Sequence, residues 1–288
     1  MSERAMGAPP IHAGGIDWPA HWRAVVEARE ASRPPMFSDD GCRWDGRAER
    51  FARLTRSLEA PTDPIILAVR QAVRPTDTLL DVGAGAGRYA LPLAEAVAQV
   101  TAVEPSAGMR AQLARQIEER HLTNVRVVPG MWEDVEVEAH DIAFVSSVLY
   151  FVPDAVRFIR KLDRSARRTC FIVHRLEERT APLRPLWEKI RGRPRPPEPS
   201  ALDLLNLLFS MGIHAHLEPV PLTEQARYRT VDDAIEEARR SLELGPNDVA
   251  HDALIREFLR HILVQRDGQL EFPPGPRMAI IWWNNADS

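Results

Sequence analysis

The residues best suited to chemistry form a glycine-rich turn that follows a short apolar run. The turn reads Asp81-Val82-Gly83-Ala84-Gly85-Ala86-Gly87, and a segment of helical character comes after it. Glycine permits the positive φ angles of a tight turn and lets a ligand approach the backbone closely. The start of the following helix offers unpaired N–H groups to an anionic group. The pattern therefore predicts a ligand site at the end of a buried strand.

An acidic residue stands at the matching place one strand later. A second strand is expected at Val100–Val103, and Glu104 follows it directly. An acid about 20 residues after the first glycine of such a turn is placed to accept hydrogen bonds from ribose hydroxyls. The turn and the acid together predict a ligand that contains a nucleoside.

Two features of the turn distinguish between nucleoside ligands. A dinucleotide fingerprint has its third glycine where this chain has Arg88, and here the last glycine comes one residue earlier. Asp81 would repel the pyrophosphate of NAD but would attract a ligand that carries an ammonium group and no phosphate. S-adenosylmethionine has these properties. An NAD-dependent dehydrogenase is the weaker alternative, and Arg88 argues against it.

Three segments carry a resemblance to a known family. The segment Asp81–Gly87 resembles the first motif of class I S-adenosylmethionine-dependent methyltransferases, and Val103–Ser106 resembles their second. Ser146–Asp154 is similar to the segment after their fourth strand, particularly in the subgroup that includes ubiquinone and menaquinone biosynthesis enzymes. The resemblance covers roughly residues 60–175. It implies S-adenosyl-L-methionine as the cofactor and says little about the acceptor.

The resemblance also implies which residues bind the cofactor. The glycine turn would lie along the methionine part, Glu104 would hold the ribose hydroxyls, and Pro105 would lie near the adenine. Met131 stands where the family often has an acid or an amide, so Met131 and Trp132 are expected to pack on the adenine ring instead. Ser147, after the fourth strand, is expected to help line the site. The expected cofactor-binding residues are Asp81, Gly83, Ala84, Gly85, Glu104, Pro105, Met131, Trp132 and Ser147.

No catalytic residue can be assigned with the same directness. His174, at the end of the fifth expected strand, has a side chain that titrates near neutral pH, although a structural role is commoner for such a histidine. Tyr150 is a second candidate, with core packing as the equal alternative. Transfer from a sulfonium mainly requires proximity and in-line alignment, so a base is optional. The expected function is direct methyl transfer to an O, N or C atom of a small molecule. A non-catalytic cofactor-binding or assembly protein is left open.

Composition and local motifs exclude several other acceptors and partners. The formal net charge of -4 gives no reason to expect a nucleic-acid partner. DNA amino-methylating enzymes of this fold carry Asn or Asp before Pro-Pro-aromatic after the fourth strand, whereas this chain has Ser147–Tyr150. Cys42 and Cys170 lie far apart and outside any CxxC pattern, so neither a disulfide scaffold nor a zinc site is expected. His214 and His216 share one face of a strand but lack a third ligand, so no metal is expected.

Cellular location and assembly follow from weaker signals. No apolar run reaches the roughly 18 residues that a membrane span needs, so no span is expected. A reducing cytoplasm is the simplest expectation for a chain with two cysteines. A homodimer is left open.

The elements that would position these residues alternate between strand and helix. Apolar strands separated by helices of about 10–15 residues predict parallel βαβ units with helices on both faces. We therefore expect an α/β, Rossmann-like, doubly wound fold with a mostly parallel seven-stranded sheet. Strands are expected at residues 78–82, 100–103, 125–128, 142–145, 170–173, 214–220 and 278–283.

Two segments outside this pattern are expected to cover the site. Residues 1–60 are expected to form an amino-terminal helical lid, with helices at Trp18–Ala31 and Trp44–Leu58. Residues 61–288 are expected to form the cofactor-binding domain, with a helical insertion at about 223–270 before the last strand. Trp18, Trp22 and Trp44 are expected to pack on helix faces, with an acceptor pocket as the alternative. The basic, proline-rich run Arg184–Arg195 indicates a solvated linker.

Overall fold

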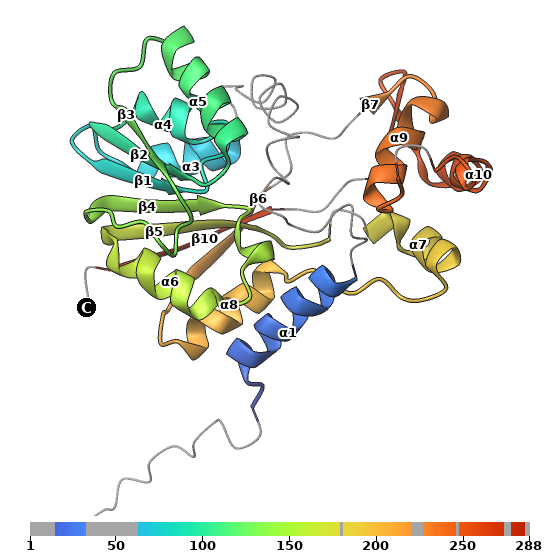
Figure 1. The fold of residues 1–288 in the computed structure, drawn as a ribbon, viewed down its shortest axis with the longest axis horizontal. Coiled ribbons are helices and arrows are strands. Elements are labelled where there is room, and N and C mark those ends of the chain that lie inside the picture. The colour runs from blue at the N-terminus through green and yellow to red at the C-terminus, as the bar shows by residue number, and fades with distance from the viewer. Residues whose placement is uncertain are drawn as a thin grey trace, which may run out of the picture.

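A seven-stranded sheet forms the centre of the computed structural model, which describes residues 15–32, 63–178, 181–220, 227–245, 248–273 and 278–285. Its strands are β1 (Thr78–Val82), β2 (Gln99–Glu104), β3 (Val125–Pro129), β4 (His140–Ser146), β5 (Ala166–Arg175), β6 (His216–Val220) and β10 (Met278–Asn284). They lie in the order β3-β2-β1-β4-β5-β10-β6 (Figure 1). Neighbouring strands are parallel except at β10, which runs antiparallel to both β5 and β6. This sheet confirms the predicted Rossmann-like α/β fold.

The strands read as continuous apolar runs because helices cover both faces of the sheet. In β1, the adjacent residues Leu79 and Leu80 are both fully buried and belong to different cores, one on each face. In β4, Phe144 and Val145 divide in the same way. Because successive side chains of a strand point to opposite faces, each strand contributes residues to both apolar cores.

Each face has its own helical layer (Figure 1). Helices α3 (Pro64–Ala72), α4 (Ala90–Ala94) and α5 (Ala107–Glu119) cover one face, while α1 (Trp18–Ala31), α6 (Ala155–Arg164) and α8 (Ala201–Ser210) cover the other. Side-chain caps begin most of these helices. Asp63, for example, accepts hydrogen bonds from the backbone N–H groups of Ile65 and Ile66 at the start of α3.

Helix α1 has the bounds that the sequence predicted, and it is part of the helical layer. Trp22 is 1% exposed, and its indole N–H donates to the carbonyl of Val152 at 2.9 Å. Trp18 packs half-buried against the same core. Packing on a helix face, the favoured expectation for these tryptophans, is thus what the structure shows for both. Trp44 and the helix expected at residues 44–58 lie outside the described residues.

A smaller helical unit lies beside the α/β body (Figure 1). It contains α7 (Arg184–Arg191), α9 (Val231–Ser241), α10 (Asp252–Ile262) and a three-stranded sheet in the order β7 (Arg227–Tyr228), β9 (Gln269–Glu271), β8 (Val264–Arg266). Short 3-10 turns, η3 (Leu149–Phe151) and η4 (Ala181–Leu183), complete the described elements. The unit has a separate apolar core, built from all three of its helices.

The expectation of a solvated linker at Arg184–Arg195 is wrong. Most of this run is helix α7, which Gly192 ends in the left-handed conformation. Trp187 is buried in the core of the helical unit, and the guanidinium of Arg195 lies 4.7 Å from its ring centroid. Arg195 of this run therefore stacks and pairs inside the protein, which its charge alone did not suggest.

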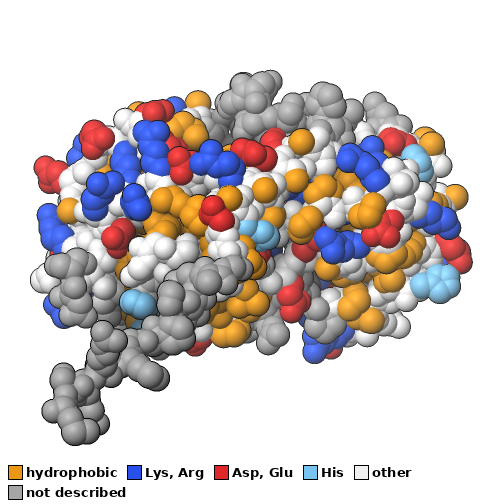
Figure 2. Space-filling view, turned by 90° about the horizontal axis from the view of Figure 1, so that it is seen from below, with side chains coloured by type: hydrophobic (Ala, Val, Ile, Leu, Met, Phe, Trp, Pro, Cys, Tyr) orange, Lys and Arg blue, Asp and Glu red, His pale blue; other side chains and the backbone are white. Residues whose placement is uncertain are grey.

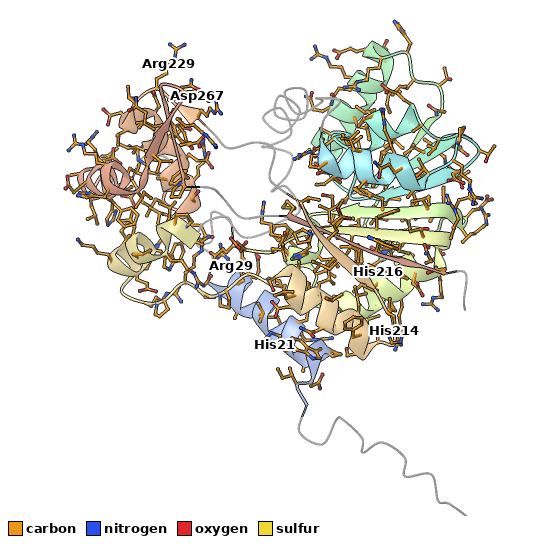
Figure 3. The ribbon with its side chains drawn as sticks, turned by 180° about the vertical axis from the view of Figure 1, so that it is seen from behind. His21, Arg29, His214, His216, Arg229 and Asp267 are labelled. Carbon is orange, nitrogen blue, oxygen red and sulfur yellow. The ribbon has the colours of Figure 1, made fainter. Side chains whose placement is uncertain are left out.

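Buried ion pairs join the helical unit to the α/β body. Arg29 of α1 is 3% exposed and pairs with Glu243, which follows α9, and with Glu198 at 3.4 Å. Arg195 pairs with Glu243 at 3.6 Å and with Glu178 at 3.2 Å. Figure 3 shows Arg29 at the end of α1 that is nearest the helical unit. We call these five residues the junction network.

The surface carries charges of both signs. Figure 2 looks onto the face formed by α1, α6 and α8, and basic and acidic side chains intermingle over it. Within the described ranges, no helix is both long and apolar enough to cross a membrane.

Candidate active site

A cavity of about 410 Å³ opens where β1, β2, β4 and β5 end. The chain runs from β1 to β2 and β3 on one side and returns to β4 on the other, so the cavity lies where the strand order reverses. Open α/β sheets bind their ligands at such a switch point. The volume is in the range of about 300–1,000 Å³ that small-molecule sites occupy.

The glycine turn forms one wall of the cavity. Gly83 has φ +74°, and a Cβ there would come within 2.4 Å of Val148 Cγ2. Gly85 has φ +57°, but a Cβ there would meet no atom within 4 Å. The turn is therefore packed tightly at Gly83 and borders open space at Gly85, where a ligand can lie against the backbone.

Glu104 connects this turn to the start of α5. One carboxylate oxygen accepts from the Gly85 N–H at 2.8 Å, and the other accepts from the Ser106 N–H at 2.8 Å. The side chain is 5% exposed and lines the cavity. A carboxylate can accept about four hydrogen bonds, so ribose hydroxyls can still donate to it.

Asp81 supplies a second carboxylate at the end of β1. It is 2% exposed, and its Oδ2 atom has no hydrogen-bond partner. Burial raises the pKa of Asp81 to about 7, and the neighbouring Glu104 charge adds to this, while the Ala90 backbone N–H opposes it. An orphaned buried carboxylate is costly unless a cation pairs with it. The residue therefore fits a ligand with an ammonium group.

The residues that follow β3 form another part of the cavity wall on the side expected to bind the cofactor. Met131 is 52% exposed at the cavity, whereas Trp132 is buried. The Trp132 indole N–H donates to the Phe158 carbonyl at 3.3 Å, and Lys161 Nζ lies 4.7 Å from its ring centroid. These contacts hold Trp132 rigidly, while Met131 is able to adapt to a ring.

The structure brings all nine predicted cofactor residues to this one cavity. Beyond those described above, Ala84, Pro105 and Ser147 also line it. Ser147 has φ +59°, an uncommon conformation outside glycine that concentrates at functional sites. The role of each residue in binding stays a prediction.

Of the two candidate catalytic residues, Tyr150 lines the cavity and His174 does not. Tyr150 lines the cavity, and its hydroxyl accepts from the Arg175 backbone N–H at 2.7 Å. Burial raises the pKa of Tyr150 to about 12, so its hydroxyl is a proton donor. His174 is fully buried outside the lining, with its ring centroid 4.1 Å from that of Tyr150. Burial lowers the pKa of His174 to about 3, which leaves the ring neutral at physiological pH.

Four charged residues of the cavity were not among the predicted site residues, namely Asp63, Arg88, Glu133 and Arg175. Arg88 pairs with Asp63 at 3.1 Å, and both line the cavity together with Arg175. Arg88 belongs to the glycine turn, and Arg175 ends β5. Ligands of open α/β sheets bind at the carboxyl ends of the strands. The place of Arg175 at the end of a predicted strand was therefore the feature of the sequence that could have identified it as a site residue.

The histidines and acids of the described ranges form no cluster that could hold a metal ion. His216 instead stacks on Trp282, with ring centroids 4.1 Å apart and planes inclined by 20°. His214 lies before β6, so the two histidines do not share a strand face as expected.

Comparison with known proteins identifies the region around the cavity. Residues 80–173 match the sequence model of a family described as "Methyltransferase domain". An uncharacterized protein of Haemophilus influenzae is 27% identical over 272 residues, which cover 90% of this chain and 93% of that protein. That likeness extends over most of both the α/β body and the helical unit.

Two solved structures show the same fold. The YcgJ protein from Bacillus subtilis has a TM-score of 0.53 at 16% identity, over 77% of this chain and 98% of its own. A protein from Bacillus halodurans C-125, provisionally named a methyltransferase, has a TM-score of 0.50 at 15% identity, over 76% and 95%. Residues 80–173 therefore match a methyltransferase domain, and the two structures show that this region lies in a methyltransferase-like Rossmann fold.

Proposed function

We propose that this methyltransferase transfers the methyl group of S-adenosylmethionine directly to an O, N or C atom of a small molecule. The observation that carries the proposal is the convergence of the glycine turn, Glu104 and the unpartnered Asp81 on one enclosed cavity. The similarity of the Ser146–Asp154 segment is the reason to propose a place in the subgroup that includes ubiquinone and menaquinone biosynthesis enzymes.

The residues present fit the cofactor at each part of its structure. Asp81 would pair with the ammonium group, since the carboxylate is buried and has an oxygen without a partner. Gly85 would border the methionine chain, where a Cβ would meet open space. Glu104 would accept from the ribose hydroxyls, with Pro105 and Met131 beside the adenine.

The protein's part in the reaction is mainly positional. When bound, S-adenosylmethionine supplies a methyl group that its positive sulfur already activates. The side chains of Val148, Tyr150 and Phe151 bound the remaining cavity and would hold the acceptor in line while they exclude water. Within the described ranges, no histidine lines the cavity.

The amino-terminal segment and the helical unit form part of this proposal as a cover. Among the described residues, none from α1 or from 227–273 lines the cavity. However, Trp22 contacts Val152, which does line it, and the junction network connects α1 to the helical unit. We expect hydrogen exchange in residues 227–263 to slow when S-adenosylhomocysteine binds. Unchanged exchange there would contradict a cover.

Calorimetry followed by a turnover assay tests the main proposal. Titration with S-adenosylhomocysteine should show one site per chain, and NAD should not compete. Incubation with radiolabelled S-adenosylmethionine and a fractionated small-molecule extract should then transfer label to a low-molecular-weight product. Binding without transfer to any fraction would favour the non-catalytic alternative. Tight NAD binding without S-adenosylhomocysteine binding would refute the proposal.

A further inference from the structure

Arg175 lies at the end of the cavity opposite Glu104. The two residues end β5 and β2, and β1 and β4 lie between these strands. Three strand spacings separate them by about 14 Å across the sheet. If Glu104 holds the ribose, as the proposed function requires, Arg175 is on the side of the acceptor.

The guanidinium of Arg175 is held in place by Tyr150. Its central carbon lies 5.2 Å from the Tyr150 ring centroid, and the Arg175 backbone N–H donates to the Tyr150 hydroxyl at 2.7 Å. Because the hydroxyl oxygen already accepts from Arg175, the hydroxyl can offer its own proton to a ligand. A cation and a phenol donor therefore lie together in the cavity lining.

The charge of Arg175 is only partly balanced by its surroundings. Within the described ranges, no carboxylate lies within ion-pair distance of it, and its buried Nε has no hydrogen-bond partner. The acid whose charge it influences is Glu198, which already pairs with Arg29. Burial raises the pKa of Glu198, but the charges of Arg175, Arg29 and Arg195 outweigh it and leave that pKa below its usual value.

The other arginine of the cavity differs in this respect. Arg88 has Asp63 within 3.1 Å, so its charge is already balanced. Near Arg175 the lining includes apolar residues, because Met278 is its partner on β10 and Phe151 lies against Tyr150. One cation without an ion-pair partner in the described ranges and one hydroxyl donor in apolar surroundings match a single carboxylate on an apolar body. A phosphate dianion would call for more donors.

We propose that the methyl acceptor is a small apolar carboxylic acid, whose carboxylate binds the Arg175 guanidinium and the Tyr150 hydroxyl. Arg175 thus determines specificity at the acceptor end, and the inference rests on the proposed function. Charge-assisted hydrogen bonds contribute about 1.5–3 kcal/mol each. An acid should accordingly bind at least about tenfold more tightly than its uncharged amide.

The test titrates protein saturated with S-adenosylhomocysteine with benzoate, benzamide and phenyl phosphate, and follows binding by calorimetry or ligand-observed NMR. Benzoate should bind at least tenfold more tightly than benzamide. Arg175→Met should abolish this preference and change S-adenosylhomocysteine affinity by less than twofold. Arg175→Lys should keep part of it, and Tyr150→Phe should reduce it severalfold. Arg184→Met is the matched control, because Arg184 pairs with Glu178 and does not line the cavity.

Each contrary result identifies what failed. Equal binding of benzoate and benzamide, or a preference that survives in Arg175→Met, overturns the inference, as does a preference for phenyl phosphate. Loss of S-adenosylhomocysteine binding in Arg175→Met would show that Arg175 serves the cofactor instead. Wild-type protein that binds no S-adenosylhomocysteine overturns the proposed function as well. If Arg175→Met does not fold, Arg175→Lys and Tyr150→Phe decide the question.

Discussion

The two ends of the cavity differ in the sign of the charge that their side chains carry. At the β1–β2 end, Asp81 and Glu104 bring two carboxylates into a buried space. At the β5 end, Arg175 brings a positive charge with no carboxylate within ion-pair distance in the described ranges. The acidic end would therefore attract a cation, and the basic end an anion.

The ends also differ in how firmly they are organised before a ligand binds. Glu104 is held by two backbone N–H groups, so its carboxylate is oriented in advance. Asp81 keeps one oxygen without a partner, and that oxygen gains most from a bound ammonium. The two acids therefore have different roles. Glu104 shapes the site, whereas Asp81 supplies the electrostatic attraction.

Removing the charge of Asp81 should have the largest effect. In Asp81→Asn, a bound ammonium would lose its buried counter-charge, and breaking such a pair costs about 3–5 kcal/mol. We expect S-adenosylhomocysteine affinity to fall by about 100-fold or more in calorimetry.

The unliganded Asp81→Asn variant should change in the opposite direction. The raised pKa means that ionised Asp81 costs the folded protein stability, and this cost grows as pH rises from about 4 to about 7. The variant should thus have a higher Tm than wild type at pH 8. A lower Tm with unchanged affinity would show that Asp81 is a structural residue.

The pH dependence of binding should be the next largest effect. A bound ammonium lowers the pKa of Asp81, so binding releases a proton wherever the unliganded carboxyl is still protonated. Because the pKa without ligand is about 7, affinity should rise with pH up to about 7 and level off above it. Between pH 5.5 and 7 the rise should be about tenfold or more. Asp81→Asn should bind equally at every pH in this range, and a wild-type profile as flat as that would remove Asp81 from the ammonium site.

A substitution at Glu104 should affect both affinity and stability. The Glu104 carboxylate accepts hydrogen bonds from two backbone N–H groups. In Glu104→Gln, the amide nitrogen would face one of these N–H groups and could not accept from it, and leaving that donor without a partner costs about 1–3 kcal/mol. Affinity for S-adenosylhomocysteine should fall about tenfold, and Tm should fall as well. The loss of the Glu104 charge should also lower the pKa of Asp81 and shift the pH profile of binding toward acid. Lower affinity without the acid shift would argue that the two carboxylates are not coupled.

The smallest effect is expected at the rim. Met131 is half exposed, so its side chain can pack on the adenine ring but contributes little to the protein core. Met131→Ala should weaken S-adenosylhomocysteine binding by about threefold, in keeping with a thioether–aromatic contact of about 0.3–1.5 kcal/mol. Leu202→Ala on α8 is the matched control, since Leu202 is 54% exposed and does not line the cavity. Equal effects in the two variants would remove Met131 from the adenine site.

Much of the α/β body could be predicted because burial on both faces leaves a clear pattern. The apolar run at β1 and the helix α1 appear with the predicted bounds. The glycine turn and Glu104 carry the family's spacing, so the cofactor side of the cavity was visible in the sequence. Arg175 was harder, because a single arginine at a strand end has no distinctive neighbours in the sequence.

The helical unit was predicted less completely, for physical reasons. Strands β8 and β9 have three residues each, too few for a periodic pattern, although the Asp267-Gly268 turn between them was a hairpin signal. Arg195, which follows helix α7, is neutralised within the junction network by acids outside its own segment. The burial of Arg195 depends on Glu178 and Glu243, and such pairing cannot be read from local composition.

The position of β10 has a consequence for how the protein folds. This strand pairs with β5 on one side and β6 on the other, and Met278 aligns with both Arg175 and Val220. About a hundred residues, including the whole helical unit, are synthesised between β5 and β10. During translation, the apolar edge of β5 therefore waits for a strand that emerges much later. Such long-range pairing slows folding, so the interval between β5 and β10 is when the nascent chain is most exposed to aggregation.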